Sequence, residues 1–372
     1  MSMRIIPVNE PLLGVNALKY VEECLREGWI SSEGRFIAEF ETLWARYCGV
    51  PYGVAVSSGT AALQIAMKCL GLRPGDEVIM PTFTIISCAM AIIESGALPV
   101  LVDADQRTWC MDVSQVENRI TPRTRAIMPV HMYGHPVDMD PLIELARRYN
   151  LFIVEDAAEA HGAEYKGRKV GGLGDLSCFS FYANKIITTG EGGMVLAKRS
   201  EHADRLRSLR NLCFRSDRRF CHTEIGYNYR LTNLQAAIGV SQVEQIEQHV
   251  AHKRWMGATY NERLKGIPGL CLPLEEPWAK NVYWMYGIVL DETTGMNGID
   301  FAKKLLEHNI ETRPFFLGMH EQPVFHKMGL FKDEHYPVAE QIARQGLYLP
   351  SGMTLNEEQI NEVAVSVKQI LK

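Results

Sequence analysis

Three short segments carry side chains whose types and positions could do chemistry together. Lys185 lies in FSFYANKIITTGEGGM, after an aromatic, apolar run and before a loop of small residues, and Asp156 ends the almost wholly apolar run LFIVED. A buried lysine acquires a lowered pKa that suits Schiff-base chemistry, and a buried carboxylate needs a cationic partner or strong donors. The turn SSGTAAL, at 57–63, offers hydroxyls and backbone N–H groups at the start of a predicted helix, where an anion can bind.

Each of these features also has an ordinary structural explanation. Ser58 or Thr60 could simply cap the helix that follows, as Asp156 could cap the next one. Lys185 could extend along the surface with its amine in water. Glu159 would share a helical face with Asp156 and contact the same ligand. Taken together, an anion-binding turn, a buried acid and a loop lysine are the parts that hold pyridoxal 5′-phosphate: a phosphate site, a partner for the ring nitrogen and an amine.

The elements around these segments predict that they meet at one edge of a sheet. Between about residues 50 and 200, short apolar strands alternate with helical segments, the pattern of a parallel sheet covered on both faces. Ligands of such sheets bind at the carboxyl ends of the strands. Polar residues follow several of the predicted strands: SSGT at 57–60, PTFT at 81–84, Asp103, His131, Glu155–Asp156 and Ser180.

Other segments extend this block in both directions. Apolar residues recur at helical spacing over 18–25 and 36–47, and a long helical stretch follows Leu231. Beyond it the pattern mixes strands and helices. A chain of 372 residues is also too long for one simple core. We therefore expect an α/β protein with a large domain over 1–250, which includes an N-terminal helical segment, and a smaller α+β domain over 251–372.

The composition limits the class of protein. The chain is 47% hydrophobic and 22% charged with a net charge of −5, which predicts a soluble protein without a polybasic surface for nucleic acid. The N-terminus lacks the apolar core of a signal peptide, and Glu94 interrupts the most apolar stretch, so we expect no membrane span. Nine cysteines occur singly, as in a reduced, cytoplasmic protein without a metal site. The Walker and dinucleotide-binding glycine patterns are missing.

The wider sequence resembles a known enzyme family. SSGTAAL, PTFT, HMYGHPVDMD, VEDAAEAHGA, FSFYANKIITTGEGGM and IGYNYRLTNLQAA follow the order and spacing of the DegT/DnrJ/EryC1/StrS sugar aminotransferases over nearly the whole chain. The resemblance implies the aspartate-aminotransferase-like fold (fold type I) and pyridoxal 5′-phosphate as cofactor. It also implies L-glutamate as amino donor, a nucleotide-linked keto sugar as acceptor, and a homodimer with shared active sites.

The resemblance assigns roles to the cofactor residues. Lys185 would form the Schiff base and later move the proton, with Asp156 at the ring nitrogen and Glu159 beside the phenolic oxygen. Phe83 of PTFT corresponds to an aromatic residue that stacks on the ring. The remaining positions correspond to phosphate contacts, the last of them from the other subunit: Ser58, Gly59, Thr60, Ser180 and Asn228.

Sugar contacts are implied near both ends of the chain. Trp29, Ser31 and Ser32 of GWISSEGRF correspond to one nucleotide-sugar-binding segment, and Arg313 and His320 to a second. Trp29 could instead pack over the first helix, and Arg313 could make a structural ion pair.

The acceptor sugar is the least determined part of this interpretation. ANKIITTGEGGM, NVYWMY and ETRPFF resemble most the family members that aminate GDP-4-keto-6-deoxymannose, but Phe220–Cys221 stands where those members suggest Tyr-Trp. A UDP- or dTDP-linked sugar, a 3-keto sugar, or a cofactor-binding regulatory protein remain alternatives. Dehydratases of the family replace the lysine with histidine, so Lys185 favours an aminotransferase.

Overall fold

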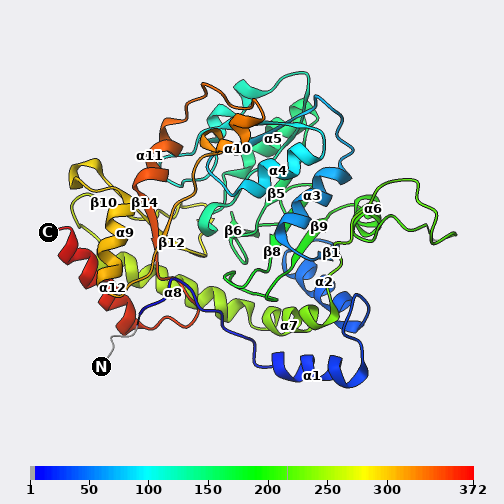
Figure 1. Cartoon of the computed structure of the whole chain (residues 1–372), viewed down its shortest axis with the longest axis horizontal. Coiled ribbons are helices and arrows are strands. Elements are labelled where there is room, and N and C mark those ends of the chain that lie inside the picture. The colour runs from blue at the N-terminus through cyan, green and yellow to red at the C-terminus, as the bar shows by residue number, and fades with distance from the viewer. Residues whose placement is uncertain (1–4, 216) are drawn as a thin grey trace.

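The computed structural model describes residues 5–215 and 217–372. Its central element is a seven-stranded sheet in the order β1-β9-β8-β5-β4-β2-β3 (Figure 1). Only β9 runs against the other strands of this sheet, so the predicted, mostly parallel sheet is confirmed. The strands are β1 (Tyr52–Val56), β2 (Glu77–Pro81), β3 (Leu98–Val102), β4 (Thr124–Ile127), β5 (Phe152–Asp156), β8 (Leu176–Ser180) and β9 (Gly193–Ala197).

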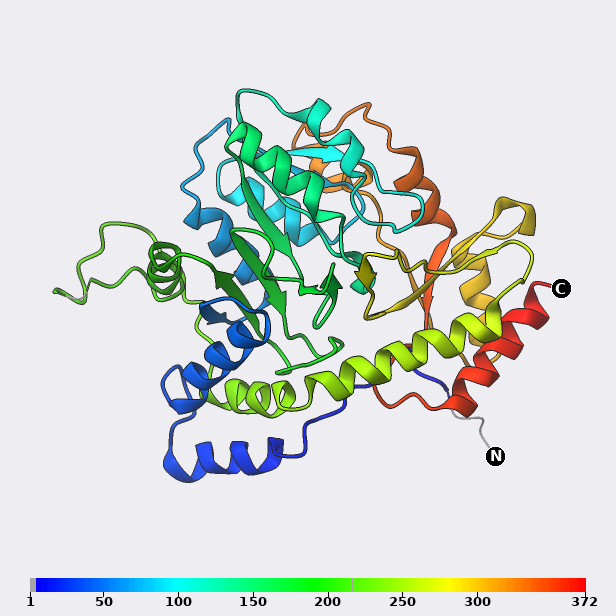
Figure 2. The same cartoon turned by 180° about the vertical axis from the view of Figure 1, so that it is seen from behind.

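Helices cover both faces of this sheet. In Figure 1 the sheet has α3 and α4 in front of it, whereas α5 lies in front in the opposite view of Figure 2. β2 and β9 are buried along their whole length, as expected of strands with a covered sheet face on either side. The helices of this part are α1 (Ala17–Glu27), α2 (Arg35–Tyr47), α3 (Gly59–Cys69), α4 (Ile86–Glu94), α5 (Met139–Tyr149) and α6 (Ser200–Arg210).

The long helical stretch predicted after Leu231 is two helices, α7 (Asn233–Val243) and α8 (Ile246–Leu264). They follow one another below the sheet and lead to the C-terminal part of the chain (Figure 2). That part holds an antiparallel sheet in the order β10-β12-β14-β13. A small sheet, β11-β6-β7, combines one strand of the C-terminal part, β11, with two short strands that follow β5. Their elements are β6 (Glu164–Tyr165), β7 (Arg168–Lys169), β10 (Leu270–Cys271), β11 (Ala279–Lys280), β12 (Tyr286–Leu290), β13 (Arg313–Pro314), β14 (Gly346–Leu349), α9 (Gly298–Glu307), α10 (Pro323–Lys327), α11 (Pro337–Gln345) and α12 (Glu357–Ile370).

Two hydrophobic cores follow from this arrangement, one around the large sheet and one between α8, α9, α12 and the antiparallel sheet. Helix α8 takes part in both: Ile246 and Val250 belong to the first core, Met256 and Tyr260 to the second. The division of the chain into domains at residue 250 stays a prediction. Within the described ranges, no helix is long and apolar enough to cross a membrane.

Candidate active site

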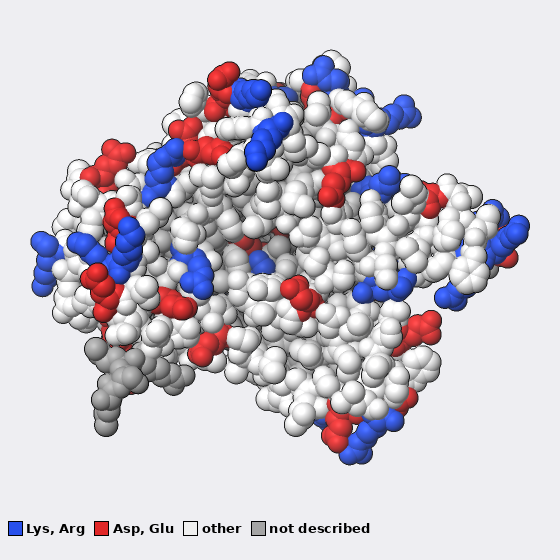
Figure 3. Space-filling view, viewed as in Figure 1, with Lys and Arg blue, Asp and Glu red and all other residues white. Residues whose placement is uncertain are grey.

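The carboxyl ends of the parallel strands meet at a cavity of about 340 Å³. Loops after β1, β5 and β8 supply most of the polar wall, as the positions of polar residues at the predicted strand ends indicated. The face in Figure 3 is hollowed near its centre, with acidic and basic side chains visible inside the hollow. Seven of the predicted cofactor residues line the cavity: Ser58, Gly59, Thr60, Asp156, Glu159, Ser180 and Lys185.

The turn after β1 forms one end of this cavity. Ser58 caps α3, since its Oγ accepts the N–H of Ala61 at 3.1 Å, and it also lines the cavity. A Cβ atom on Gly59 would lie 2.7 Å from the Cβ of Ser180, so only glycine allows the two loops to approach this closely. The N-terminus of an 11-residue helix, with hydroxyls beside it, suits a phosphate group.

Asp156 occupies the end of β5 and is buried. One carboxylate oxygen, Oδ1, accepts the N–H of Ala158 at 3.0 Å, and Oδ2 accepts the S–H of Cys88 at 3.0 Å. A buried carboxylate in these contacts can still receive a protonated ring nitrogen. The contact of Cys88 with Asp156 could not be predicted from the sequence, because nothing in the pattern distinguishes Cys88 from the other single cysteines.

Lys185 and Glu159 both line the cavity, and the charge of each affects the pKa of the other. Burial lowers the pKa of the Lys185 amine, and the nearby charges of Glu159 and Asp156 offset part of this effect. Burial likewise raises the pKa of Glu159 to about 7, although Lys185 and the N–H of Tyr133, at 2.8 Å, act in the opposite direction. An amine and an acid that both titrate nearer to neutrality are suited to proton transfer.

The loop that carries Tyr133 is fixed by a buried hydrogen bond between His131 and Glu155. Glu155 accepts a hydrogen bond from Nε2 of His131 at 3.1 Å, and His131 Nδ1 accepts the N–H of Val137 at 3.1 Å. Burial raises the pKa of Glu155, but hydrogen bonds from His131 and from backbone N–H groups outweigh burial and hold this pKa below its ordinary value. Tyr133, with a φ of 51°, is thereby held where its N–H reaches Glu159.

The rest of the wall is aromatic and aliphatic, and the predictions above missed it. Trp284, Phe316, Tyr348 and Ile85 all line the cavity. Phe83 is fully buried, with its ring near those of Phe315, Phe316 and Tyr133, and is not among the lining residues described, so its stacking on the cofactor ring stays a prediction. The NVYWMY and ETRPFF segments marked part of this wall, but nothing in the sequence placed them at the strand ends.

The comparisons with known proteins agree with this geometry. A family profile described as the DegT/DnrJ/EryC1/StrS aminotransferase family matches residues 11–368. The chain belongs to this aminotransferase family. It is 43% identical to GDP-perosamine synthase of Caulobacter vibrioides over 98% of both chains, and 41% identical to GDP-perosamine synthase of Escherichia coli O157:H7 over 99% of both. The solved structure of DesV from S. venezuelae superposes with a TM-score of 0.89 and 36% identity, over 96% of this chain and 94% of that one.

This aminotransferase therefore has the fold type I architecture and the pyridoxal 5′-phosphate cofactor that the resemblance implied. The cavity residues fit that cofactor: a helix N-terminus with hydroxyls suits its phosphate, a buried carboxylate its ring nitrogen, and a buried amine its carbonyl. In the described part of the chain, no group of three or more metal-ligating side chains is placed to hold a metal ion.

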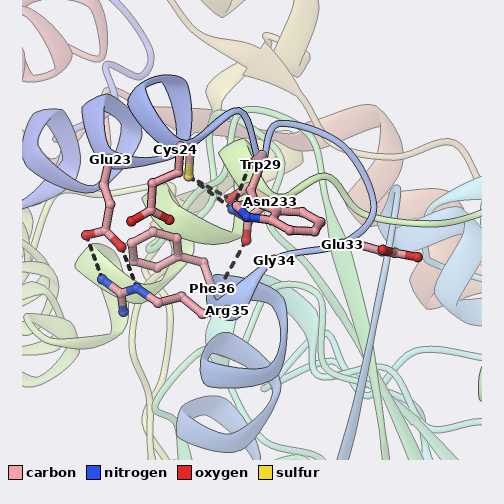
Figure 4. Close-up of a pocket in the computed structure, with 9 residues that line it drawn as sticks. Glu23, Cys24, Trp29, Glu33, Gly34, Arg35, Phe36 and Asn233 are labelled. Atoms are coloured by element: carbon pink, nitrogen blue, oxygen red, sulfur yellow. Dashed lines mark hydrogen bonds and ion pairs between the residues drawn. The ribbon is translucent and has the colours of Figure 1, made fainter.

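Other residues predicted for the aminotransferase lie elsewhere. Trp29 is half exposed in the turn between α1 and α2, and lines a second cavity of about 330 Å³ (Figure 4). Asn233, at the start of α7, organises this turn: its Nδ2 donates to the carbonyl of Trp29 at 2.7 Å, its Oδ1 accepts the N–H of Phe36 at 3.1 Å, and its own N–H donates to the carbonyl of Ser31 at 2.6 Å. Ser32 lines a neighbouring hollow with Arg210 and Arg230.

Three further residues are also outside the lining of the first cavity, as far as the described residues show. Asn228 pairs with Asn211 in an isolated bridge, and Arg313 is exposed on β13. His320 is buried, with Nδ1 2.7 Å from the hydroxyl of Thr82 and Nε2 3.2 Å from the carboxylate of Glu340. Within the chain, most of the residues predicted for the cofactor come together at one cavity, whereas those predicted for the sugar do not.

Proposed function

We propose that this aminotransferase moves an amino group from L-glutamate to a GDP-linked 4-keto-6-deoxy sugar, with GDP-4-keto-6-deoxymannose as acceptor and GDP-perosamine as product. The grouping of Lys185, Asp156 and Glu159 in one cavity at the start of α3 supports the transamination. Two relatives that carry the name GDP-perosamine synthase, at 43% and 41% identity, support the choice of sugar. Such a product belongs to the biosynthesis of surface polysaccharides, including O-antigens.

The roles of the cavity residues follow from their chemistry. Bound pyridoxal 5′-phosphate supplies the carbonyl group and the electron-accepting ring on which amino groups are exchanged. Asp156 keeps a proton on the ring nitrogen, and Glu159 lies beside the phenolic oxygen. Lys185 binds the cofactor through Nζ and, once its amine is free, carries protons to and from the reacting carbon. Ser58, Gly59, Thr60 and Ser180 hold the phosphate.

We also propose where the nucleotide sugar binds and what the second subunit contributes to the site. We place the nucleotide sugar against Trp29, Ser31, Ser32, Arg313 and His320, and the phosphate contact of Asn228 in the partner's site. A homodimer is supported by the outer surface around α1, which exposes apolar side chains that a monomer would leave in water: Leu13, Val15, Leu18, Leu25 and Ile30. The nine free cysteines favour a cytoplasmic, reducing location.

An absorption spectrum tests the cofactor lysine. The purified chain, reconstituted with pyridoxal 5′-phosphate, should show the band of a protonated cofactor imine, and Lys185→Ala should lose it. Lys198→Ala is the control, because the Lys198 amine donates to the carbonyl of Leu173 outside the cavity. A wild-type chain that stays colourless after reconstitution would contradict the proposal.

A substrate panel tests the acceptor. The chain is incubated with L-glutamate and with GDP-, UDP- and dTDP-linked 4-keto-6-deoxy sugars, and with a 3-keto sugar nucleotide. We expect amination of the GDP-linked 4-keto sugar. If that sugar is ignored and another is aminated, the GDP assignment is wrong and the transamination stands. If the cofactor binds but glutamate does not convert it to its amine form, the chain is a binding protein instead.

A further inference from the structure

A tryptophan touches the amine of Lys185. The Nζ atom lies 3.6 Å from the centroid of the Trp284 ring, within the cavity wall. Among the described residues, Nζ makes no hydrogen bond or ion pair. An ammonium at this distance from an indole face is attracted by the negative face of the ring, and tryptophan is the strongest of the aromatic residues in such contacts.

The indole is held in this orientation from several sides. Trp284 is only 4% exposed. Its Nε1–H donates to the carbonyl of Asn184, the residue before the lysine, at 2.8 Å, and its own carbonyl accepts a hydrogen bond from the buried amine of Lys253 at 2.8 Å. The ring of Tyr133 stacks against it, with centroids 6.3 Å apart and planes inclined by 26°. Bonds at both the ring and the backbone leave the indole little freedom to turn away from Nζ.

A free Lys185 amine has few other partners once the cofactor is bound. The charge of Asp156 is then used by the ring nitrogen. Burial raises the pKa of Glu159, which disfavours its charged form as a partner of the ammonium. The indole face keeps its attraction for the ammonium in every one of these states, because it does not titrate.

We propose that Trp284 is a catalytic residue whose indole face holds the Lys185 ammonium whenever this amine is not bonded to the cofactor. The proposal rests on Lys185 as the cofactor lysine. The contact keeps the proton donor inside the cavity and at the reacting carbon, where water would otherwise compete for it. Removal of the indole removes a stabilising partner of the charged amine and therefore lowers the pKa of the amine.

Several groups that titrate or carry charge face Lys185 or Trp284 and act on the same equilibrium. They are Asp156, Glu159 and His161 after β5, Tyr133 before α5, Glu191 before β9, Tyr348 on β14 and Lys253 on α8.

The experiment measures the pKa of the Lys185 amine directly. The full-length chain is saturated with pyridoxamine 5′-phosphate, which occupies the cofactor site but cannot bond to the lysine. Competitive acetylation over a range of pH, read by mass spectrometry of the Lys185 peptide, gives the pKa. The variants are Trp284→Leu, which removes the ring, and Trp284→Phe, which keeps a weaker one. Trp255→Leu is the control, because Trp255 is on α8 and packs against His252 outside the cavity.

We expect the pKa of the amine to fall by about 0.5 to 1.5 units in Trp284→Leu, the equivalent of a partly or fully desolvated cation–π contact. Trp284→Phe should fall less, and Trp255→Leu should match the wild type. At neutral pH, acetylation of Lys185 should be several-fold faster in Trp284→Leu.

An unchanged or raised pKa in Trp284→Leu would overturn the proposal, since a raised value would mean that the ring acts only by excluding water. If Trp284→Leu does not fold, judged by circular dichroism, Trp284→Phe alone decides between these outcomes. The absorption spectrum of Lys185→Ala tests the cofactor lysine separately, so a failure of that assignment is distinguishable from a failure of the Trp284 contact.

Discussion

At the residue scale, the site depends on Asp156, the buried carboxylate at the end of β5. We expect Asp156→Asn to weaken binding of pyridoxal 5′-phosphate by about 10- to 100-fold, because a charge-assisted hydrogen bond to the ring nitrogen becomes a neutral one. Titration of the cofactor-free chain, followed by absorption, measures this. Asp175→Asn is the control, because Asp175 accepts the N–H of Ile153 at 2.9 Å away from the cavity. Equal cofactor affinities in both variants would show that Asp156 does not bind the ring nitrogen.

Glu159 gives the cofactor-free chain a pH-dependent stability. Its pKa is about 7 in the folded chain against an ordinary value of 4.5. Between these values the folded chain keeps a proton that the unfolded chain has released, so the free energy of unfolding falls as pH rises, by at most about 3 kcal/mol. Above pH 7 both states are ionised and the loss is complete.

Urea unfolding of the wild type and of Glu159→Gln at pH 5 and pH 8 measures this effect. The variant is neutral at both pH values, so it should lose less stability than the wild type between them. An equal loss in both proteins would show that Glu159 is ionised in the folded chain throughout this range.

At the scale of elements, Asn233 connects α7 to the turn between α1 and α2. Asn233→Asp keeps the acceptor for the N–H of Phe36 but replaces the donor to the Trp29 carbonyl with a second oxygen. We expect the turn to shift, and the KM for the nucleotide sugar to rise by about 10-fold. The half-reaction with glutamate should keep its rate, because it does not use the turn.

Stopped-flow absorption of the glutamate half-reaction and steady-state kinetics with the sugar separate these effects. Asn356→Asp is a suitable control, since the side-chain Oδ1 of Asn356 also accepts a backbone N–H, that of Gln359 at 2.9 Å, but does so at the start of α12, outside the turn. A turn that has no part in sugar binding would leave KM unchanged in Asn233→Asp as well.

The elements also separate what the sequence could predict from what it could not. The turn at Ser58, Asp156 and Lys185 each follow a strand with a clear apolar pattern, and parallel strands place their carboxyl ends together. The aromatic wall comes from β14 and from loops beside β12 and β13, whose packing against the large sheet is not encoded in any local period. The turn after β2 is a related case: Ile85 lines the cavity and Phe83 is buried, because the direction of each side chain there depends on tertiary packing.

At the scale of the whole molecule, the proposed homodimer makes a distinct prediction. If Asn228 serves the partner's site, a dimer of one Lys185→Ala chain and one Asn228→Ala chain has one site with both residues intact. Random mixing should then give about a quarter of the wild-type activity, above the average of the two separate variants. Activity after co-refolding at equal concentrations, compared with unmixed samples, measures this. Mixed samples that equal the average would place Asn228 outside a shared site.

The cavity wall begins at Ser58 and ends at Tyr348 of a 372-residue chain. During synthesis, the turn, the carboxylate and the lysine leave the ribosome long before β14 does. A nascent chain therefore exposes a reactive amine and an incomplete cleft until its last elements fold into place. The complete cofactor site is thus available only after the last elements of the chain have been made and folded.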